Sequence, residues 1–296
     1  MGQSGLLAKI KANAELIQNL KDINFDQRHW QQFQDFFVEY LDNYHLCEYN
    51  PNLALCPQSF QGYKYYFIYE NNILVLTRVE CNHRIAYNEL HRVKNNYVVY
   101  DFSDELFKLR LNDVDQDLNF KNLKKIIEQM IKFVKGTRKK GLYIYGNPGV
   151  GKTYLAIRLA NTLANNGKKI AFISVINLIN KIKASFNLSV NDSSLVEKLL
   201  SSDVLFLDDI GGESVSAWVR DDLLFRILND RVSQNKPVFF TSNFNLTKLI
   251  LLYCNIKNDL HDSATNQIKA LRIVDRIRGL ASEIELLGNS RRGMEE

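Results

Sequence analysis

The residues that most plainly carry chemistry are Gly-Asn-Pro-Gly-Val-Gly-Lys-Thr at positions 146–153. They fit the pattern G-x-x-x-x-G-K-[ST] at every required position, after an apolar stretch and before a helical one. Glycines let the backbone curl so that its amides point at phosphate oxygens, and a helix N-terminus adds partial positive charge. We therefore expect the whole loop to bind a nucleotide: Gly146, Asn147, Pro148, Gly149, Val150, Gly151, Lys152 and Thr153.

Two residues of this loop are expected to contact Mg-ATP directly through their side chains. Lys152 is expected to reach the β- and γ-phosphates, and the Thr153 hydroxyl to ligate Mg²⁺. Asp208 ends the apolar stretch Val-Leu-Phe-Leu, 55 residues after Thr153. A buried strand that delivers a carboxylate downstream of a phosphate loop predicts that Asp208 is the second protein ligand of that Mg²⁺.

Asp209 is the candidate to orient the attacking water. Most ATP-hydrolysing machines of this kind have Glu at this position, and the Asp side chain is one methylene shorter. Misplacing a catalytic group by about 1 Å costs on the order of a hundredfold in rate, so slow hydrolysis is expected. Glu213 is a substitute base by type, although we expect it on the surface.

Polar and basic residues later in the chain complete the candidate site. Asn243 follows the apolar stretch Pro-Val-Phe-Phe and is expected near the γ-phosphate. One arginine commonly stabilises the charge that develops in phosphoryl transfer, from the same or a neighbouring subunit. The candidates lie on one predicted helix and near the C-terminus: Arg272, Arg276, Arg278, Arg291 and Arg292.

The elements that must position these residues alternate through the C-terminal half. Apolar strands alternating with helices predict an α/β fold, with a parallel sheet flanked by helices on both faces. The predicted strands are 141–145, 168–175, 203–209 and 237–243, and the predicted helices are 152–165, 177–184, 219–232 and 264–280.

The N-terminal part has a different pattern. Residues 4–45 show helical spacing of apolar residues. Residues 63–80 are rich in aromatic and branched residues around an Asn-Asn turn, which predicts a β-hairpin, and residues 91–102 repeat this pattern. We therefore expect a smaller helical and β domain at 1–105, a polar linker at 106–118, and the nucleotide-binding domain at 119–296, opening with a helix from about Asn119 to Lys135.

Charge and hydropathy limit the function classes. Apolar stretches are too short to span a bilayer and the N-terminus lacks a secretory signal, so the cytoplasm is the expected location. Residues 1–110 carry 11 Lys and Arg against 13 Asp and Glu, whereas residues 111–296 carry 27 against 20. A basic C-terminal half suits a phosphate-bearing partner, and a solvated basic surface explains it equally well.

Several motifs in order resemble the DnaI-type helicase loaders, in the DnaI/DnaC branch of the AAA+ ATPases. They are LDDIGGE, SAWVRDDLLFRILNDR, FFTSNF, RIVDRIRGLA and GNSRR, and the resemblance covers about residues 119–292. It implies an AAA+ fold in which Asn243 is the sensor-1 residue, Arg276 the arginine finger and Arg292, or Arg291, the sensor-2 arginine. The Asp-Asp pair also belongs to this branch, which favours a slow ATP-controlled switch.

The resemblance further implies partners: the hexameric replicative helicase, single-stranded DNA and, with ATP bound, further copies of the chain. It also implies zinc in the N-terminal domain. Cys47, Cys56 and Cys81 are the candidate thiolate ligands, with His83 or His45 as the fourth. Their spacing is unusual for a zinc knuckle, and free cysteines in a small aromatic core are the alternative.

Residues that contact DNA are harder to assign. Lys181, Lys183 and Phe186 combine cations with a stacking aromatic on one predicted helix, a pairing typical of single-strand binding. An ordinary amphipathic helix with solvent-exposed lysines explains these residues at least as well. Lys139 and Lys140 are interpreted as a basic linker.

The sequence thus predicts an ATP-dependent helicase loader with weak ATPase activity that acts in the initiation of DNA replication. Two alternatives remain open. One is a transposition-helper ATPase that acts with a transposase, against which the long N-terminal domain argues. The other is a non-catalytic adaptor that holds ATP only as a structural ligand.

Overall fold

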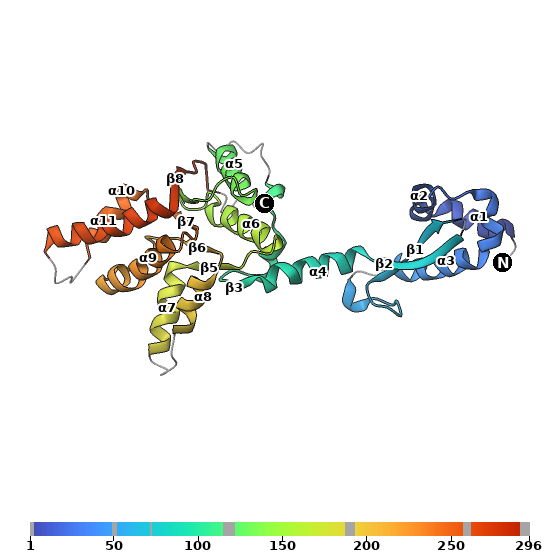
Figure 1. Cartoon of the computed structure of the whole chain (residues 1–296), viewed down its shortest axis with the longest axis horizontal. Coiled ribbons are helices and arrows are strands. Elements are labelled where there is room, and N and C mark those ends of the chain that lie inside the picture. The colour runs from blue at the N-terminus through green and yellow to red at the C-terminus, as the bar shows by residue number, and fades with distance from the viewer. Residues whose placement is uncertain are drawn as a thin grey trace. The chain divides into compact units, whose positions relative to one another are not determined.

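The computed structural model describes residues 3–48, 52–71, 73–114, 122–186, 193–256 and 262–290. The chain divides into two compact units, a smaller unit at 1–90 and a larger unit at 91–296 (Figure 1). The division falls earlier than the boundary predicted from the sequence.

The smaller unit packs helices against one β-hairpin. Its core is aromatic and aliphatic, with Phe37, Phe67 and Leu74 almost fully buried. The predicted helical N-terminus and first hairpin are confirmed. The elements are α1 (Gln3–Ala12), α2 (Ala14–Asp22), the 3-10 helix η1 (Gln27–Phe33), α3 (Gln34–Glu48), the 3-10 turn η2 (Leu53–Leu55), and the antiparallel strands β1 (Tyr63–Glu70) and β2 (Ile73–Glu80).

One buried amide joins helix α2 to the hairpin. Asn19 accepts from the backbone N–H of Phe67 at 2.8 Å and donates to the Phe67 carbonyl at 3.1 Å. Both backbone groups of Phe67 face away from β2 at this register, so the Asn19 side chain satisfies polar groups that would otherwise be buried without partners.

The second predicted hairpin is wrong. Residues Asn82–Asn95 form helix α4, and only Tyr97–Val99 form a strand, β3. The segment is rich in residues that favour helices, and Asn96 ends the helix instead of turning a hairpin, with its side chain donating to the Ala164 carbonyl at 2.9 Å. Strand β3 pairs in parallel with β5 (Ile170–Ser174), so it belongs to the larger unit.

The predicted linker also belongs to the larger unit as far as it is described. Two 3-10 turns, η3 (Asp104–Lys108) and η4 (Leu111–Asp113), bury Phe107 and Leu111 in its core. The Asn161 side chain donates to the carbonyls of Leu106 and Leu109 at 2.7 and 2.9 Å. Residues 115–118 of the predicted linker lie outside the described residues.

A six-stranded parallel sheet forms the centre of the larger unit, as predicted. Its strand order is β3-β5-β6-β7-β4-β8. Besides β3 and β5, its strands are β4 (Gly141–Tyr145), β6 (Val204–Asp208), β7 (Val238–Ser242) and β8 (Ala281–Glu285), of which β8 was missed in the sequence.

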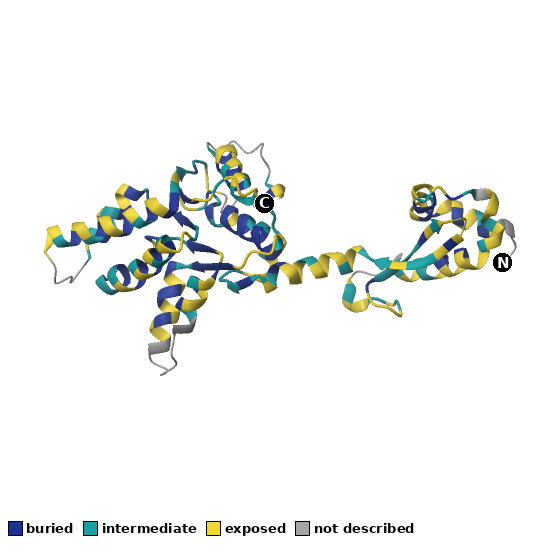
Figure 2. Ribbon diagram, viewed as in Figure 1, coloured by how far each residue is buried: buried dark blue, intermediate teal, exposed yellow. Residues whose placement is uncertain are grey.

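Helices cover both faces of this sheet, because successive strand residues point to opposite faces and both sets are apolar. On β6, Val204 and Phe206 join one core cluster whereas Leu205 and Leu207 join the other. The strands are correspondingly buried (Figure 2). One face carries α5 (Leu123–Val134) and α6 (Lys152–Asn165), and the other carries α7 (Val175–Phe186), α8 (Ser193–Ser201), α9 (Phe225–Ser233), α10 (Leu246–Cys254) and α11 (Ser263–Leu280).

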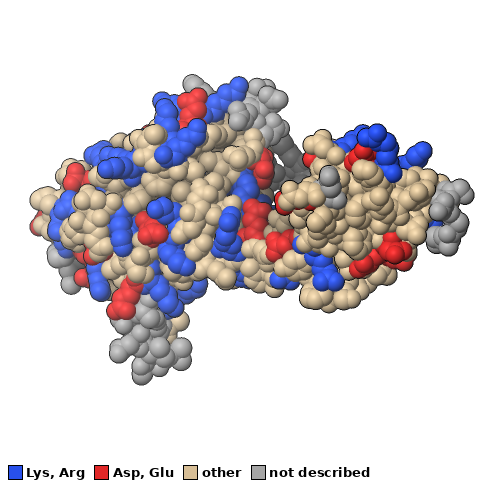
Figure 3. All heavy atoms as spheres, turned by 45° about the vertical axis from the view of Figure 1, so that its right-hand side comes forward, with Lys and Arg blue, Asp and Glu red and all other residues tan. Residues whose placement is uncertain are grey.

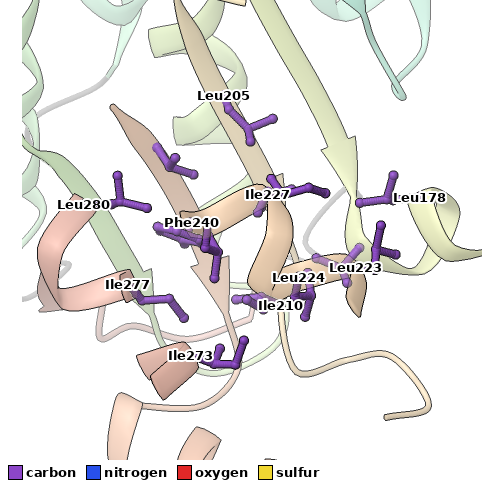
Figure 4. Packing of buried hydrophobic residues seen from close by; sticks show 14 of the residues in the cluster. Leu178, Leu205, Ile210, Leu223, Leu224, Ile227, Phe240, Ile273, Ile277 and Leu280 are labelled. Atoms are coloured by element: carbon purple, nitrogen blue, oxygen red, sulfur yellow. The ribbon is translucent and has the colours of Figure 1, made fainter. Parts of the chain in front are cut away.

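Helix α9 is preceded by a π-helical segment, Val219–Leu224, within the stretch predicted as one helix. Leu223 and Leu224 of this segment and Ile227 of α9 pack with Phe240 of β7 and Ile273 of α11 (Figure 4). The packing ties α11 to the middle of the sheet through α9.

A fully buried arginine on α9 satisfies backbone carbonyls at the amino ends of the strands. The guanidinium of Arg231 donates to the carbonyls of Ser202 at 2.7 Å and Pro237 at 2.8 Å, and more weakly to that of Asp203 at 3.2 Å. Burial lowers the pKa of Arg231 to about 10, so the group stays charged at neutral pH. Arg231 thereby fixes the backbone of the residues that directly precede β6 and β7.

The Arg231→Met variant is expected to lose about 3 kcal/mol of the free energy of unfolding, because several buried carbonyls lose a charged donor at once. Urea unfolding followed by circular dichroism measures the change. The control is Arg226→Met on the exposed side of the same helix, expected to stay within about 0.5 kcal/mol of wild type. Equal unfolding midpoints for the two variants would contradict this role of Arg231.

Candidate nucleotide-binding site

The candidate site forms at the carboxyl ends of three neighbouring strands. The loop 146–151 follows β4, Asp208 ends β6, and Asn243 follows β7. In the sheet, β7 lies between β6 and β4. Because parallel strands end at the same edge, segments almost a hundred residues apart in the chain meet there.

The backbone of the loop has the geometry that phosphate binding requires. Gly146, Gly149 and Gly151 have φ of +158°, +84° and +97°, values that favour glycine. Helix α6 begins at Lys152, and no side chain caps its N-terminus at Gly151. The first backbone N–H groups of the helix thus remain for an anion, which fits the predicted phosphate site.

The C-terminal segment lies on the same loop. The Leu286 amide donates to the Tyr145 carbonyl at 2.7 Å, and the Leu286 carbonyl is so close that a Cβ at position 146 would overlap it. A Cβ at position 149 would overlap the Ser290 hydroxyl. The candidate arginines Arg291 and Arg292 follow this segment but lie outside the described residues.

Lys152 is buried at the centre of the site. Its ammonium donates to the carbonyls of Gly146 at 2.9 Å and Asn147 at 3.0 Å, and to Oδ1 of Asn243 at 2.9 Å. The cation therefore lies inside the curl of the loop and beside the end of β7, where a phosphate chain on the loop would meet it.

The two predicted magnesium ligands are in contact. The Thr153 hydroxyl donates to Oδ1 of Asp208 at 2.9 Å, and the Thr241 hydroxyl donates to the same oxygen at 2.6 Å. Burial raises the pKa of Asp208, although both hydroxyls act in the opposite direction. A carboxylate and a hydroxyl at the foot of a phosphate loop are suitable oxygen ligands for Mg²⁺.

Asp209 adopts a backbone conformation that is uncommon for a residue with a side chain, with φ of +53°. Its backbone N–H donates to the Thr241 hydroxyl at 2.9 Å, and its Oδ1 accepts from the Asn243 amide at 3.0 Å. Asn243 thus bridges Lys152 and Asp209. The structure brings together Lys152, Thr153, Asp208, Asp209 and Asn243, as the sequence analysis expected.

Glu213 is not on the surface, contrary to the expectation. It is 7% exposed, and its carboxylate accepts from the Gly211 amide and from the hydroxyl of Tyr253, each at 2.7 Å. Burial raises the pKa of Glu213. One carboxylate oxygen of Glu213 binds the loop after Asp209 and the other binds helix α10. Glu213 therefore fixes that loop to the helix.

Two of the arginines of helix α11, Arg272 and Arg276, contact α9. Arg276 donates to Oδ1 of Asn229 at 3.2 Å and pairs with Asp275 at 3.1 Å, while the Arg272 guanidinium lies 4.2 Å from the centre of the Phe225 ring. Arg278 is exposed. Arg276 therefore contacts its own helix and α9, and its side chain is 31% exposed.

The predicted zinc site is not supported. Cys47, Cys56 and Cys81 are free and half-buried, and no group of three His, Cys, Asp or Glu side chains within the described ranges could hold a metal. Two of the sulfurs accept hydrogen bonds from nearby groups: Gln58 donates to Cys47 at 3.0 Å, and the backbone N–H of Gly62 donates to Cys56 at 3.3 Å. His83 and His45 are exposed.

The candidate DNA-binding lysines lie on the surface. Lys181 and Lys183 are exposed on α7, and Lys139 and Lys140 are exposed before β4. The side chain of Phe186 lies outside the described residues. Figure 3 shows Lys and Arg side chains distributed over the larger unit among acidic ones, without a single continuous basic stripe on the face in view.

Sequence reasoning missed Thr241 and Tyr253. Thr241 lies within the predicted strand 237–243, and the signal was a hydroxyl directly after the apolar residues 237–240, next to the Asp208 strand. Tyr253 is fully buried on α10, a helix that the sequence analysis did not predict, so no local pattern identified it.

Comparison with known proteins places the chain in a family. The model of the IstB-like ATP binding proteins matches residues 98–293, which is most of the larger unit. The chain belongs to the IstB-like ATP-binding family. The site of this IstB-like protein lies within the matched region.

Individual relatives extend the match beyond the IstB-like region. The replicative helicase loader DnaI of Bacillus subtilis is 28% identical over 300 aligned positions, covering 99% of this chain and 90% of that protein. The crystal structure of DnaI is 36% identical and has a TM-score of 0.56, covering 68% of this chain and all of that one. The replicative helicase loader DnaC of Escherichia coli K12 is 29% identical over 108 residues, 36% of this chain and 44% of that protein.

Among the described helices, none combines the length and the apolar character needed to cross a membrane.

The buried carboxylate of Glu213 predicts a pH-dependent effect of its substitution. Because its pKa is raised in the folded state, ionised Glu213 lowers the stability of the fold above its folded pKa, and this cost disappears below its unfolded value of 4.5. The free energy of unfolding of Glu213→Gln, relative to wild type, should therefore increase from pH 4 to pH 8. Chemical unfolding at several pH values measures it, and a difference independent of pH would contradict the assignment.

Proposed function

We propose that this protein is an ATP-dependent loader of the replicative DNA helicase. The observation that carries the proposal is its similarity to a helicase loader along almost the whole of both chains, including the smaller unit. A shared nucleotide-binding unit alone would support only ATP binding. The similarity of the smaller unit as well favours the same partner.

The larger unit supplies the residues that would hold Mg-ATP. Residues 146–153 would hold its phosphates through backbone N–H groups and Lys152, and Thr153 and Asp208 would hold the metal. The bound nucleotide supplies a γ-phosphate with an electrophilic phosphorus and a metal ion that offsets its charge. Asp209 and Asn243 are then the residues of this chain that face the attacking water.

We infer slow turnover from the geometry of Asp209. The carboxylate is short, its backbone is in the left-handed region, and Asn243 donates to it. A carboxylate held in this way reaches less far than that of a glutamate on the same turn, so ATP hydrolysis would be slow. It would then switch the protein between its ATP-bound and ADP-bound states and would not drive rapid cycling.

The two units divide the work in this proposal. The smaller unit, 1–90, binds the hexameric helicase, and the larger unit binds single-stranded DNA and Mg-ATP. Exposed Lys181 and Lys183 on α7 are the proposed DNA contacts. Arg276 reaches the nucleotide of a neighbouring copy when ATP favours self-association; its partial exposure and its contact with Asn229 of α9 support this role.

A transposition helper that acts with a transposase is the second candidate, because the matched family model is that of the IstB-like proteins. The family model begins at residue 98 and so leaves out the smaller unit. Identifying the protein that the smaller unit binds therefore distinguishes a helicase loader from a transposition helper.

Capture of the helicase tests the proposal. The full chain, residues 1–90 and residues 91–296 are immobilised in turn and mixed with the purified replicative helicase of the same cell, with and without ATP. We expect capture by the full chain and by 1–90, and none by 91–296. Failure of all three to bind the helicase, with binding of a transposase from the same cell, would favour the second candidate.

Two substitutions separate nucleotide binding from its use. Lys152→Ala should abolish both ATP binding and turnover, because the loop loses its buried cation. Arg276→Ala should leave ATP binding within about threefold of wild type but lower turnover on the order of a hundredfold, together with ATP-dependent assembly. Nucleotide titration, phosphate release and sedimentation measure these. Turnover of wild type no faster than that of Lys152→Ala would instead favour an adaptor that only holds ATP.

A further inference from the structure

Thr241 makes hydrogen bonds to three consecutive residues of the neighbouring strand end. Its hydroxyl donates to Oδ1 of Asp208 at 2.6 Å and accepts from the N–H of Asp209 at 2.9 Å, and its carbonyl accepts from the N–H of Ile210 at 2.9 Å. At 3% exposure the residue is buried, so these partners are fixed and not exchanged with water.

The position of Thr241 in the sheet explains why a side chain is needed here. The regular pairing of β6 with β7 ends at Leu207 and Phe240. Beyond that pair Asp209 turns into the left-handed region, so its N–H points where no strand carbonyl accepts it. The Thr241 hydroxyl supplies the missing acceptor and uses its one proton on Asp208.

Asp208 also accepts a hydrogen bond from the Thr153 hydroxyl, but the two hydroxyls belong to different parts of the site. Thr153 belongs to the phosphate loop and is the hydroxyl that the loop offers to the metal of the nucleotide, so its contact with Asp208 is the one that the metal would replace. Thr241 belongs to the strand β7 and keeps its contact in either state. Its hydroxyl contacts both the predicted metal ligand, Asp208, and the backbone of the predicted water-orienting residue, Asp209.

We infer that Thr241 is a positioning residue of this site, whose hydroxyl fixes the Asp208 carboxylate for the metal ion and the Asp209 turn for the attacking water. The role deepens the proposed function and rests on it for the identity of the nucleotide. A threonine suits the task because its methyl group packs in the strand while its hydroxyl faces the turn. Serine keeps the hydroxyl, and valine keeps the shape without it.

The test compares Thr241→Val, Thr241→Ser and wild type in the full chain, with Thr162→Val as the matched control. The Thr162 hydroxyl on α6 likewise accepts a backbone N–H, that of Leu111 in η4, but it donates to the backbone carbonyl of Arg158 and not to a carboxylate of the site. Binding of a fluorescent ATP analogue is titrated with Mg²⁺. We expect Thr241→Val to raise the half-saturating Mg²⁺ concentration about tenfold, because a charged acceptor loses its donor, and Thr241→Ser to stay within about threefold of wild type.

A second measurement needs no nucleotide. Hydrogen exchange of a peptide that spans 207–212 should be faster in Thr241→Val than in wild type and Thr162→Val, because the Asp209 amide has lost its acceptor. Failure of the proposed function would appear as wild type that binds no ATP, while the exchange result still tests Thr241. Unchanged Mg²⁺ dependence together with unchanged exchange in Thr241→Val would overturn the inference, as would a folded Thr241→Ser that behaves like Thr241→Val.

Discussion

The placement of β7 between β6 and β4 is the constraint on which the rest of the site depends. The loop after β4 presents backbone amides and a lysine, and β6 presents two carboxylates. Neither set alone is a nucleotide site. Because β7 pairs with both strands, residues at its end contact both sets. Asn243 connects Lys152 to Asp209, and Thr241 donates to Asp208. The chemistry of the site follows from strand order.

Burial then determines how strongly the charges of the site interact. Lys152 and Glu213 are less than a tenth exposed, and Asp208 is largely enclosed by hydroxyls. In such surroundings an unpaired charge is costly and a paired one acts strongly. Asn243 bonds both Lys152 and Asp209, while the hydroxyls of Thr153 and Thr241 bond Asp208. Glu213 accepts from Gly211 and Tyr253, so each of these charged groups has a hydrogen-bond partner within the fold.

The sequence predicted the larger unit well because its signals were local. The strands and the phosphate loop are continuous stretches with clear patterns, and parallel strands bring their ends together without further information. It predicted poorly wherever an element depended on distant contacts. The pair Asn95-Asn96 suits a turn between strands, yet it lies at the end of a helix. Phe107 and Leu111 lie in a largely polar stretch and become part of the core because they pack against α6.

The same reason explains the errors at particular side chains. Glu213 was expected on the surface because its neighbours are glycines and serines, and only the buried Tyr253, forty residues later, makes it a brace. The resemblance to the helicase loaders implied a zinc site at the cysteines, with free cysteines as the alternative, whereas the sulfurs of Cys47 and Cys56 accept from Gln58 and Gly62. Spacing along a chain identifies candidate metal ligands, but it does not show whether their side chains lie close together in the folded protein.

The position of β8 bears on how the protein reaches its folded state. Strand β4 lies between β7 and β8, and the phosphate loop after β4 is covered by residues 286 and 290. Non-local parallel pairings form slowly because the entropy of closing a long loop must be overcome first. The nucleotide pocket is therefore completed late, after about 140 residues beyond β4 have been added, and a nascent chain that already displays the full phosphate loop is not yet able to bind ATP as the finished protein does.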